Sequence, residues 1–247
     1  MSGFLLNMLS MPVVGAGFGF GQSSWSGKVI VLILVVGSVL AWTMMLTKFL
    51  ELKKASLESG RFILAYRGES HPVALFQNKD HVGADSPLRN IYDQSCSALG
   101  ASLEASAGNV DDLLDGGSST RIILSDRHIN SVRSSADRTV ADQALVLENR
   151  MGLLATAAST APFLGLLGTV WGVMEAFGNM GSSGSALLAD VAPGISGALF
   201  TTVVGLLVAL PSSIGYNILS DHIRRLTVMM DNFAQELVGD IERVHLP

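Results

Sequence analysis

The sequence predicts an all-α membrane protein with three transmembrane helices and long helical extensions on the cytoplasmic side. Of its 247 residues, 49% are hydrophobic and only 15% are charged, whereas a soluble domain usually carries about 25% charged residues. The mean hydropathy is positive. Three apolar stretches are each long enough to cross a hydrocarbon core roughly 30 Å thick. These observations indicate membrane spans rather than a large soluble core.

The first predicted span covers residues 28–49. Trp25 and Trp42 lie near its ends, as aromatic residues at membrane interfaces do. The preceding residues 1–27 have neither a basic amino-terminal stretch nor an A-x-A cleavage site. We therefore expect residues 1–27 to be an outward-facing segment against the membrane, with the first span as an uncleaved anchor.

The second and third predicted spans cover residues 151–177 and 193–218, joined by a short link at 178–192. No formal charge occurs in residues 151–174 or in residues 191–219. Both runs exceed the length that a bilayer requires, so both helices are expected to project beyond the membrane on one side. Pro193 and Gly194 are expected to begin the third span.

The placement of lysine and arginine predicts the orientation. Residues 47–150 carry twelve of them and residues 219–247 carry three, whereas the 178–192 link carries none. Positive charge favours the cytoplasmic side. The amino terminus and the link are therefore predicted to be periplasmic, and residues 50–150 and 219–247 cytoplasmic.

Residues 50–150 have a mostly helical pattern. A polar helix continues the first span through residues 51–66, and a turn-rich break follows at 68–85. Ser86 and Pro87 are typical of a helix start, and that helix is expected to end near residue 105. After a loop at 108–119, a helix from about residue 120 is expected to run straight into the second span. Its apolar positions are Ile129, Val132, Ala136, Val140 and Leu147.

Composition argues against several other kinds of site. The net charge of −5 disfavours a nucleic-acid partner. Cys96 is the one cysteine, so no internal disulfide can form, and we expect a small buried hydrophobic residue. Scattered histidines are expected to be solvated; they are His71, His81 and His128. Three acidic residues lack the spacing of a calcium loop and are expected to form a loop and a helix start; they are Asp111, Asp112 and Asp115.

The sequence contains no nucleophile–base arrangement, phosphate loop or metal signature, so an enzyme is not expected. Polar groups inside the spans are then the functional candidates. Thr169 lies nine residues before Gly178, and Thr202 lies nine residues after Pro193. Nine helical residues rise about 13 Å. Because the two helices are antiparallel, both hydroxyls are predicted to lie at one level near the midplane.

Small residues share a helix face with each threonine. Around Thr169 lie Ala158, Pro162, Gly165, Gly172 and Ala176; around Thr202 lie Gly194, Ala198, Gly205, Ala209, Ser212 and Ser213. Such stripes allow helices to approach closely and suggest a shared polar lining. The alternative is that each threonine only bonds its own i−4 carbonyl and that the stripes serve packing.

Two acidic residues lie near the outer ends of these spans. Glu175, about 120° from Thr169 on the helix, is expected to reach headgroups or water rather than to bind an ion. Asp190 precedes the third span and is expected to compensate the helix dipole.

Two long motifs carry a family resemblance. Residues 159–177, STAPFLGLLGTVWGVMEAF, resemble the second-helix signature of the TolQ/ExbB/MotA family of ion-driven motor channels. Residues 192–211, APGISGALFTTVVGLLVALP, resemble its third-helix signature, and Tyr216-Asn217 follows as it does there. The motifs cover about a quarter of the chain, in the family's order and with its separation.

The resemblance implies a homopentamer in the bacterial inner membrane. Its second and third helices would line a pore that holds a TolR- or ExbD-like single-span partner with an intramembrane aspartate. Ion flow would drive mechanical work on the envelope, with a TolA- or TonB-like protein as a further candidate partner. Thr169 and Thr202 match threonines on the ion path. The implied lining residues are Gly165, Gly172, Ala198, Gly205 and Ala209.

One position departs from the family pattern. Many TolQ and ExbB chains have glutamate where this chain has Gly197, about 140° from Thr202. Either the partner's acid suffices for proton transfer, or the coupling ion is sodium, which a site of hydroxyls and carbonyls would suit. No other cofactor is implied.

Trp171 and the short amino terminus favour a TolQ-like branch, which implies envelope constriction and integrity. An ExbB-like branch would energise nutrient uptake through outer-membrane receptors. MotA relatives have four spans, which disfavours that branch. A structural scaffold without ion conduction, a membrane enzyme and a channel that needs no partner are the other classes considered. The scaffold predicts full function after Thr169→Val and Thr202→Val.

Overall fold

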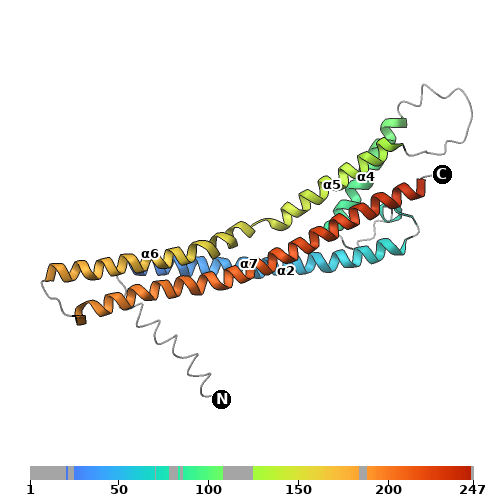
Figure 1. Ribbon diagram of the computed structural model, residues 1–247. Helices are drawn as coiled ribbons and strands as arrows, with labels where there is room; N and C mark the ends of the chain where they lie inside the picture. Colours follow the sequence, from blue (N-terminus) through green and yellow to red (C-terminus); the bar gives the residue numbers. More distant parts are fainter. Residues whose placement is uncertain are drawn as a thin grey trace, which may run out of the picture. The chain divides into compact units, whose positions relative to one another are not determined.

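The computed structural model describes residues 21, 25–69, 71–77, 83, 86–107, 125–183 and 188–245. Within these ranges the chain is α-helical apart from short turns and bends, with no β-strand. The helices are α2 (Trp25–Gly68), α3 (Ala74–Gln77), α4 (Pro87–Ala107), α5 (Asp126–Glu148), α6 (Met151–Ser183) and α7 (Leu188–His245), and Figure 1 labels the longer ones. The all-helical class predicted from the sequence is confirmed.

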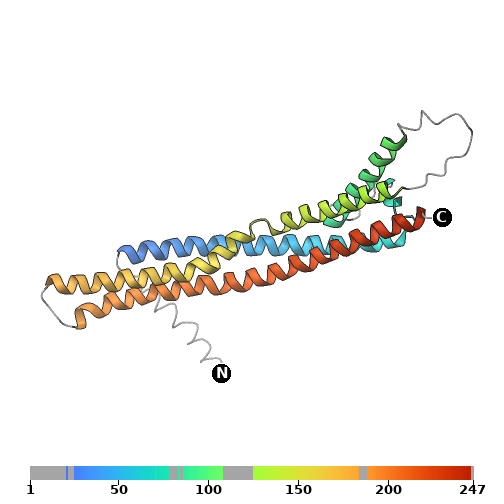
Figure 2. The ribbon, with the colours of Figure 1, turned by 45° about the horizontal axis from the view of Figure 1, so that its top comes forward.

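The chain folds as two compact units. The first unit is Met1–Thr47 with Arg150–Ile218, and the second is Lys48–Asn149 with Leu219–Pro247. Helices α2 and α7 contribute to both. Within the first unit, α6 and α7 lie side by side with α2 against them in both views (Figures 1 and 2).

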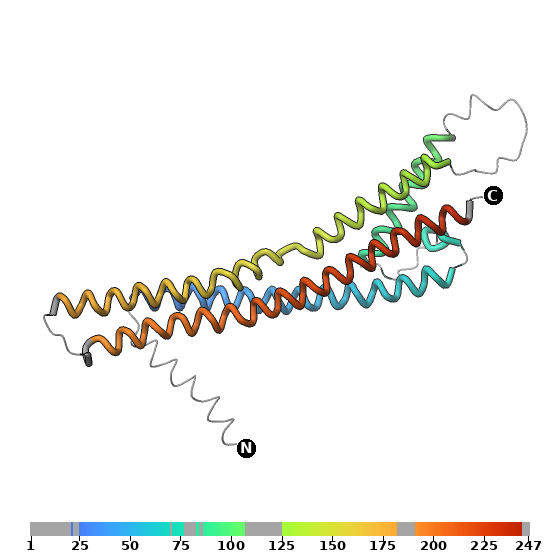
Figure 3. The backbone as a smooth tube through the Cα atoms, viewed as in Figure 1, coloured from blue at the N-terminus to red at the C-terminus, as the bar shows by residue number. Residues whose placement is uncertain are grey.

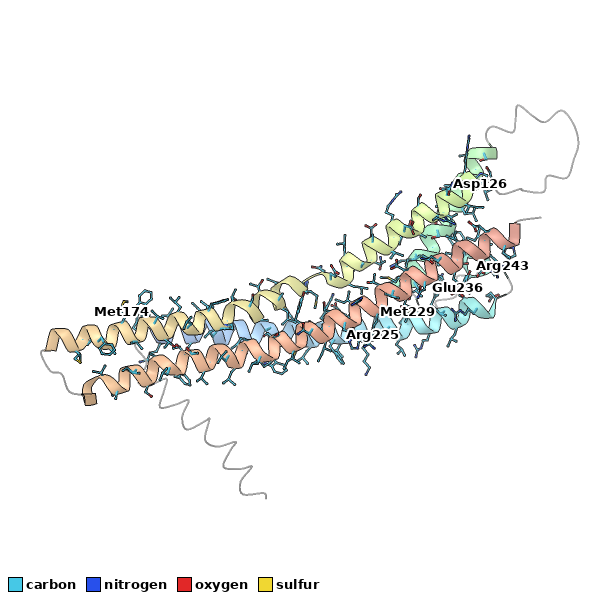
Figure 4. All side chains as sticks on the ribbon, viewed as in Figure 1. Asp126, Met174, Arg225, Met229, Glu236 and Arg243 are labelled. Carbon is cyan, nitrogen blue, oxygen red and sulfur yellow. The ribbon has the colours of Figure 1, made fainter. Side chains whose placement is uncertain are left out.

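Three helical segments are long and apolar enough to cross a membrane, as predicted: Trp25–Gly68, Met151–Gly181 and Val191–Arg243. Many of their large apolar side chains are exposed, including Leu40, Phe163 and Leu207. Met174 is 63% exposed, and Figure 4 shows it on the edge of α6 away from α7. Such a surface is unfavourable in water and suited to lipid or to further helices.

The membrane-side helices exceed a single crossing. Helix α6 has 33 residues and α7 has 58, about 50 Å and 87 Å at 1.5 Å per residue. Helical backbone enters both ends of the predicted 178–192 link, since α6 continues to Ser183 and α7 begins at Leu188. Where the membrane begins and ends along these helices stays a prediction.

An apolar cluster joins the three helices of the first unit. Its buried residues are Ile30, Leu34, Ala161, Val208 and Ala209, from α2, α6 and α7. Gly215 on α7 lies against the Met45 side chain of α2. The cluster fixes α2 beside the α6–α7 pair.

Aromatic rings form the core of the second unit. Phe62 and Tyr66 of α2 meet Tyr92 of α4 and Phe233 of α7 edge to face, with centroids 5.2–5.9 Å apart. Edge-to-face contact suits the ring quadrupoles. This core ties α4 to the distal parts of α2 and α7, and α4 also packs against α5.

Polar contacts surround that core. The Tyr66 hydroxyl donates to Asp240 Oδ2 at 3.0 Å; burial, reinforced by this bond, raises the pKa of Tyr66. The Arg67 guanidinium donates two hydrogen bonds of 2.8 Å to Glu236, which Figure 4 labels on α7. These bonds hold the pKa of the Glu236 carboxyl below its ordinary value.

Two predictions for the second unit are confirmed. Helix α4 begins at Pro87, and Ser86 caps it by accepting the Leu88 N–H at 3.1 Å. Cys96 is buried, and burial raises the pKa of its thiol to about 12.

The predicted continuous helix from residue 120 into the second span is wrong. Helix α5 ends at Glu148 and α6 begins at Met151, and Figure 3 shows the interruption as a straighter stretch of tube. Arg150 has a φ of 70°, in the left-handed region, which an α-helix excludes. The stripe of α5 is buried as expected at Val132, Ala136, Val140 and Leu147.

The expectation of a solvated His128 is also wrong. His128 is 8% exposed, and its Nδ1 accepts the Ser125 backbone N–H at 3.1 Å. A neutral imidazole that accepts at Nδ1 carries its proton on Nε2, which lies 2.7 Å from Ser106 Oγ. His128 therefore caps α5 and links it to α4. His71 is exposed, as expected.

Several predictions fall outside the described residues. They concern residues 1–20, His81, the loop at 108–119 with Asp111, Asp112 and Asp115, and the Asp190 side chain.

Candidate functional site

The two predicted threonines meet where α6 packs against α7. Thr169 Oγ1 and Thr202 Oγ1 are hydrogen-bonded to each other. Thr169 Oγ1 also lies 3.0 Å from the Ala198 carbonyl oxygen across the interface, and 3.3 Å from Gly165 O on its own helix. Thr202 Oγ1 lies 3.2 Å from Gly165 O. The hydroxyls therefore face each other between the helices and do not only cap their own backbone.

A third hydroxyl joins this cluster and was missed from the sequence. Thr201 is fully buried, and its Oγ1 lies 2.7 Å from Ala198 O and 3.0 Å from Gly165 O. It also lies 3.5 Å from Thr169 Oγ1. Gly168, the glycine directly before Thr169, lies against this hydroxyl, since a Cβ on Gly168 would meet Thr201 Oγ1 at 2.5 Å. The face of α7 toward α6 is centred between residues 201 and 202.

Glycines make this close approach possible. A Cβ on Gly205 would lie 2.6 Å from Ala161 O, and one on Gly172 would lie 2.7 Å from Ala198 Cβ. On Gly165 it would lie 3.0 Å from Thr201 O. Side chains at these positions would separate the helices and break the hydroxyl contact, as expected for small residues at membrane-helix interfaces.

The remaining predicted lining residues fall into different surroundings. Ala198 supplies a carbonyl to the hydroxyl cluster. Ala209 instead lies in the apolar cluster with α2. Gly194 faces Ala176, which would be 2.9 Å from an added Cβ. The third helix does not begin at Pro193, because α7 starts at Leu188. Pro193 lies near the amino-terminal end of α7, where its missing N–H removes only one hydrogen bond of the helix.

Two positions were considered for an acid: Glu175, and Gly197, where many relatives have glutamate. Neither adds a carboxylate to the threonine hydroxyls. Glu175 Oε2 accepts a hydrogen bond of 3.1 Å from Ser26 Oγ of α2. Gly197 is buried on α7. The Glu175 carboxylate therefore bonds α2 rather than the threonines.

The hydroxyl cluster is thus five oxygens: Thr169 Oγ1, Thr201 Oγ1, Thr202 Oγ1, Gly165 O and Ala198 O. Such oxygens can relay hydrogen bonds or solvate a hard cation. They cannot hold a proton at neutral pH, since none is a carboxylate or an imidazole. Proton transfer through this cluster would need an acid supplied from elsewhere.

Comparison with known proteins places these helices in a family. A model of the MotA/TolQ/ExbB proton channel family matches residues 109–232, half of the chain. The match includes all of α5 and α6 and the threonine-bearing part of α7.

Comparison with individual proteins points to the same family. The Tol-Pal system protein TolQ of Haemophilus influenzae is 43% identical over 97 residues, 39% of this chain and 42% of that protein. The biopolymer transport protein ExbB of Pseudomonas putida is 30% identical over 220 residues, 87% of this chain and 60% of that protein. The ExbB of Neisseria gonorrhoeae is 45% identical over 87 residues, 35% of this chain and 40% of that protein. The matches thus span less than two thirds of these relatives. The family description is of channels, not enzymes, and the chain belongs to the MotA/TolQ/ExbB proton channel family.

Proposed function

We propose that the chain is a stator subunit that converts an ion gradient into mechanical work on the cell envelope. The observation that carries the proposal is the contact of Thr169, Thr201 and Thr202 between two apolar helices. Polar groups inside a membrane are costly. Three hydroxyls between helices that are proposed to cross the membrane therefore favour a role in an ion pathway. The hydroxyl cluster lacks a carboxylate of its own, which fits a path completed by an acid on a partner.

The proposed complex is a homopentamer in the bacterial inner membrane. Helices α6 and α7 would surround single-span partners of the TolR or ExbD kind, each with an intramembrane aspartate. The amino terminus and the 178–192 link would be periplasmic, and residues 50–150 and 219–247 cytoplasmic. The exposed apolar surfaces of α6 and α7 offer the area that such a ring would use, for example at Leu167 and Leu206.

Native mass spectrometry of the detergent-purified complex tests this assembly. The chain would be co-expressed with a single-span protein encoded beside it. We expect five copies of the 26.0 kDa chain with two smaller subunits. A monomer or dimer without partner would contradict the pore and leave the small-residue stripes as ordinary packing.

Isosteric substitution tests the ion path. Valine has the shape of threonine without the hydroxyl, so Thr169→Val and Thr202→Val should strongly reduce ion-driven activity, to a residual level that can still be measured, while the complex keeps its subunit composition. Full activity of both variants would favour the scaffold interpretation.

The coupling ion is proposed to be the proton, with sodium as the alternative suited to an oxygen-only site. Activity in sodium-free buffer separates the two. Full activity there excludes sodium, and loss that sodium restores excludes the proton.

We propose a TolQ-like branch, supported by Trp171 and by the TolQ relatives, with ExbB-like energised uptake as the alternative supported by the ExbB relatives. Deletion of the gene distinguishes them. A TolQ-like role predicts detergent sensitivity and chained cells, and would involve a TolA-like partner. An ExbB-like role predicts loss of growth on scarce nutrients that enter through outer-membrane receptors, and would involve a TonB-like partner.

A further inference from the structure

Thr201 competes with the Thr169–Thr202 pair for the same hydrogen-bond acceptors. Its Oγ1 lies 2.7 Å from Ala198 O and 3.0 Å from Gly165 O. Thr169 Oγ1 reaches Ala198 O at 3.0 Å, and Thr202 Oγ1 reaches Gly165 O at 3.2 Å. Two carbonyls therefore face three hydroxyls.

A count of hydrogens shows what this competition does. Each carbonyl oxygen has two lone pairs, and the helix bond from residue i+4 uses one of them. Gly165 O and Ala198 O thus have one free acceptor position each, while the three hydroxyls carry three hydrogens. The third hydrogen has no carbonyl left and must be donated to another hydroxyl oxygen.

The distances identify which hydroxyls share it. Thr169 Oγ1 and Thr202 Oγ1 are in hydrogen-bonding contact, whereas Thr201 Oγ1 is 3.5 Å from Thr169 Oγ1. Thr201 is 0% exposed, so no solvent can take its hydrogen. Thr201 must therefore occupy one carbonyl, and the pair shares the other. Without the Thr201 hydroxyl, Thr169 and Thr202 could each take one carbonyl and separate.

We infer that Thr201 is a positioning residue of the ion path, which keeps Thr169 and Thr202 hydrogen-bonded to each other by occupying one of their two carbonyl acceptors. The inference rests on the proposed function. Two arrangements satisfy every group: the pair ends on Ala198 O with Thr201 on Gly165 O, or the reverse. In the first arrangement Thr202 Oγ1 accepts no hydrogen bond within the cluster, and in the second Thr169 Oγ1 accepts none, so either threonine can accept a hydrogen bond from an acid.

Proton flux into proteoliposomes that contain the complete complex tests the inference. Thr201→Val should reduce flux about tenfold, as expected when about 1.4 kcal/mol of transition-state positioning is lost. Thr201→Ser keeps the hydroxyl and should retain most of the flux. Thr43→Val is the matched control, since the Thr43 hydroxyl bonds Val39 O of its own helix at 2.8 Å.

A double-mutant cycle separates positioning from packing. If Thr201 acts through the pair, Thr201→Val should cause no further loss in a Thr202→Val background. Independent, multiplying losses would overturn the inference, and so would full flux in Thr201→Val or loss of flux in Thr201→Ser. If Thr201→Val fails to assemble by native mass, Thr201→Ala takes its place in the cycle. Full flux in Thr169→Val and Thr202→Val would contradict the proposed function itself, whereas full flux in Thr201→Val alone contradicts only this inference.

Discussion

The Arg67–Glu236 ion pair ties α2 to α7 inside the second unit through two hydrogen bonds of 2.8 Å. The paired guanidinium lowers the folded-state pKa of Glu236 below its ordinary value. A carboxylate with a depressed pKa stabilises the fold above its unfolded pKa, about 4.3. That contribution is lost as the pH falls through the folded value. Because the pair is largely exposed, solvent screening keeps the contribution small.

We therefore expect Glu236→Gln to lower the unfolding temperature of the second unit slightly at pH 7. The difference from the unmodified protein should shrink as the pH falls below about 4. Thermal unfolding in detergent across this pH range measures it. Glu148→Gln, at an exposed glutamate near the end of α5, is the control. A difference that persists at low pH would mean that the carboxylate charge is not the cause.

Single residues show which details a sequence can predict. Rise and rotation per residue sufficed to bring Thr169 and Thr202 to one level on facing stripes. They could not select Thr201, because the rotation of α7 toward α6 depends on packing of both helices against α2. The error at His128 has a similar origin, since its partner Ser106 belongs to another helix.

The α6–α7 contact depends on glycines at the scale of the helix pair. A Cβ on Gly205 would meet Ala161 O at 2.6 Å and Gly165 Cα at 3.0 Å, both backbone atoms that cannot rotate away. Gly205→Ala should separate the helices, at an overpacking cost of about 1–3 kcal/mol.

Loss of ion-driven activity together with a lower unfolding temperature is the expected result for Gly205→Ala. Gly152→Ala on α6 is the matched control, because an added Cβ there meets nothing within 4 Å. An active and equally stable Gly205→Ala variant would mean that the helices are not held this closely.

The boundary between α5 and α6 shows a limit of periodicity. Apolar positions continue through Leu147, Met151 and Leu154, so the pattern gives no sign of a break. Asn149, which caps the end of α5, is a residue type that often follows a helix, whereas Arg150 is neither a glycine nor a proline and carries no such signal. The positive φ of Arg150 follows from the fold around it rather than from local preference.

At the scale of the whole molecule, the proposed topology predicts which surfaces external reagents reach. Gly181 at the end of α6 and Arg138 on α5 are both exposed. Gly181→Cys should react with a membrane-impermeant maleimide in intact spheroplasts, whereas Arg138→Cys should react only after permeabilisation. The reverse pattern would invert the orientation derived from lysine and arginine.

The helical class and the three candidate spans followed from hydropathy alone, because each span is a local property of the chain. The division into two units did not follow, since α2 and α7 each contribute to both. The aromatic core of the second unit joins Phe62 to Phe233, residues far apart in sequence, through a contact that no local pattern encodes.

The burial of Cys96 gives the protein an internal reporter of its own fluctuations. A thiol reacts as its thiolate, and burial holds the Cys96 pKa at about 12. Modification at neutral pH must then wait for α4 to open away from the rest of the second unit. Its rate would follow the free energy of that opening, as amide hydrogen exchange does. A protein that docks on the second unit and restrains α4 would slow the modification. The natural Cys96 side chain could therefore detect such a contact without an engineered cysteine.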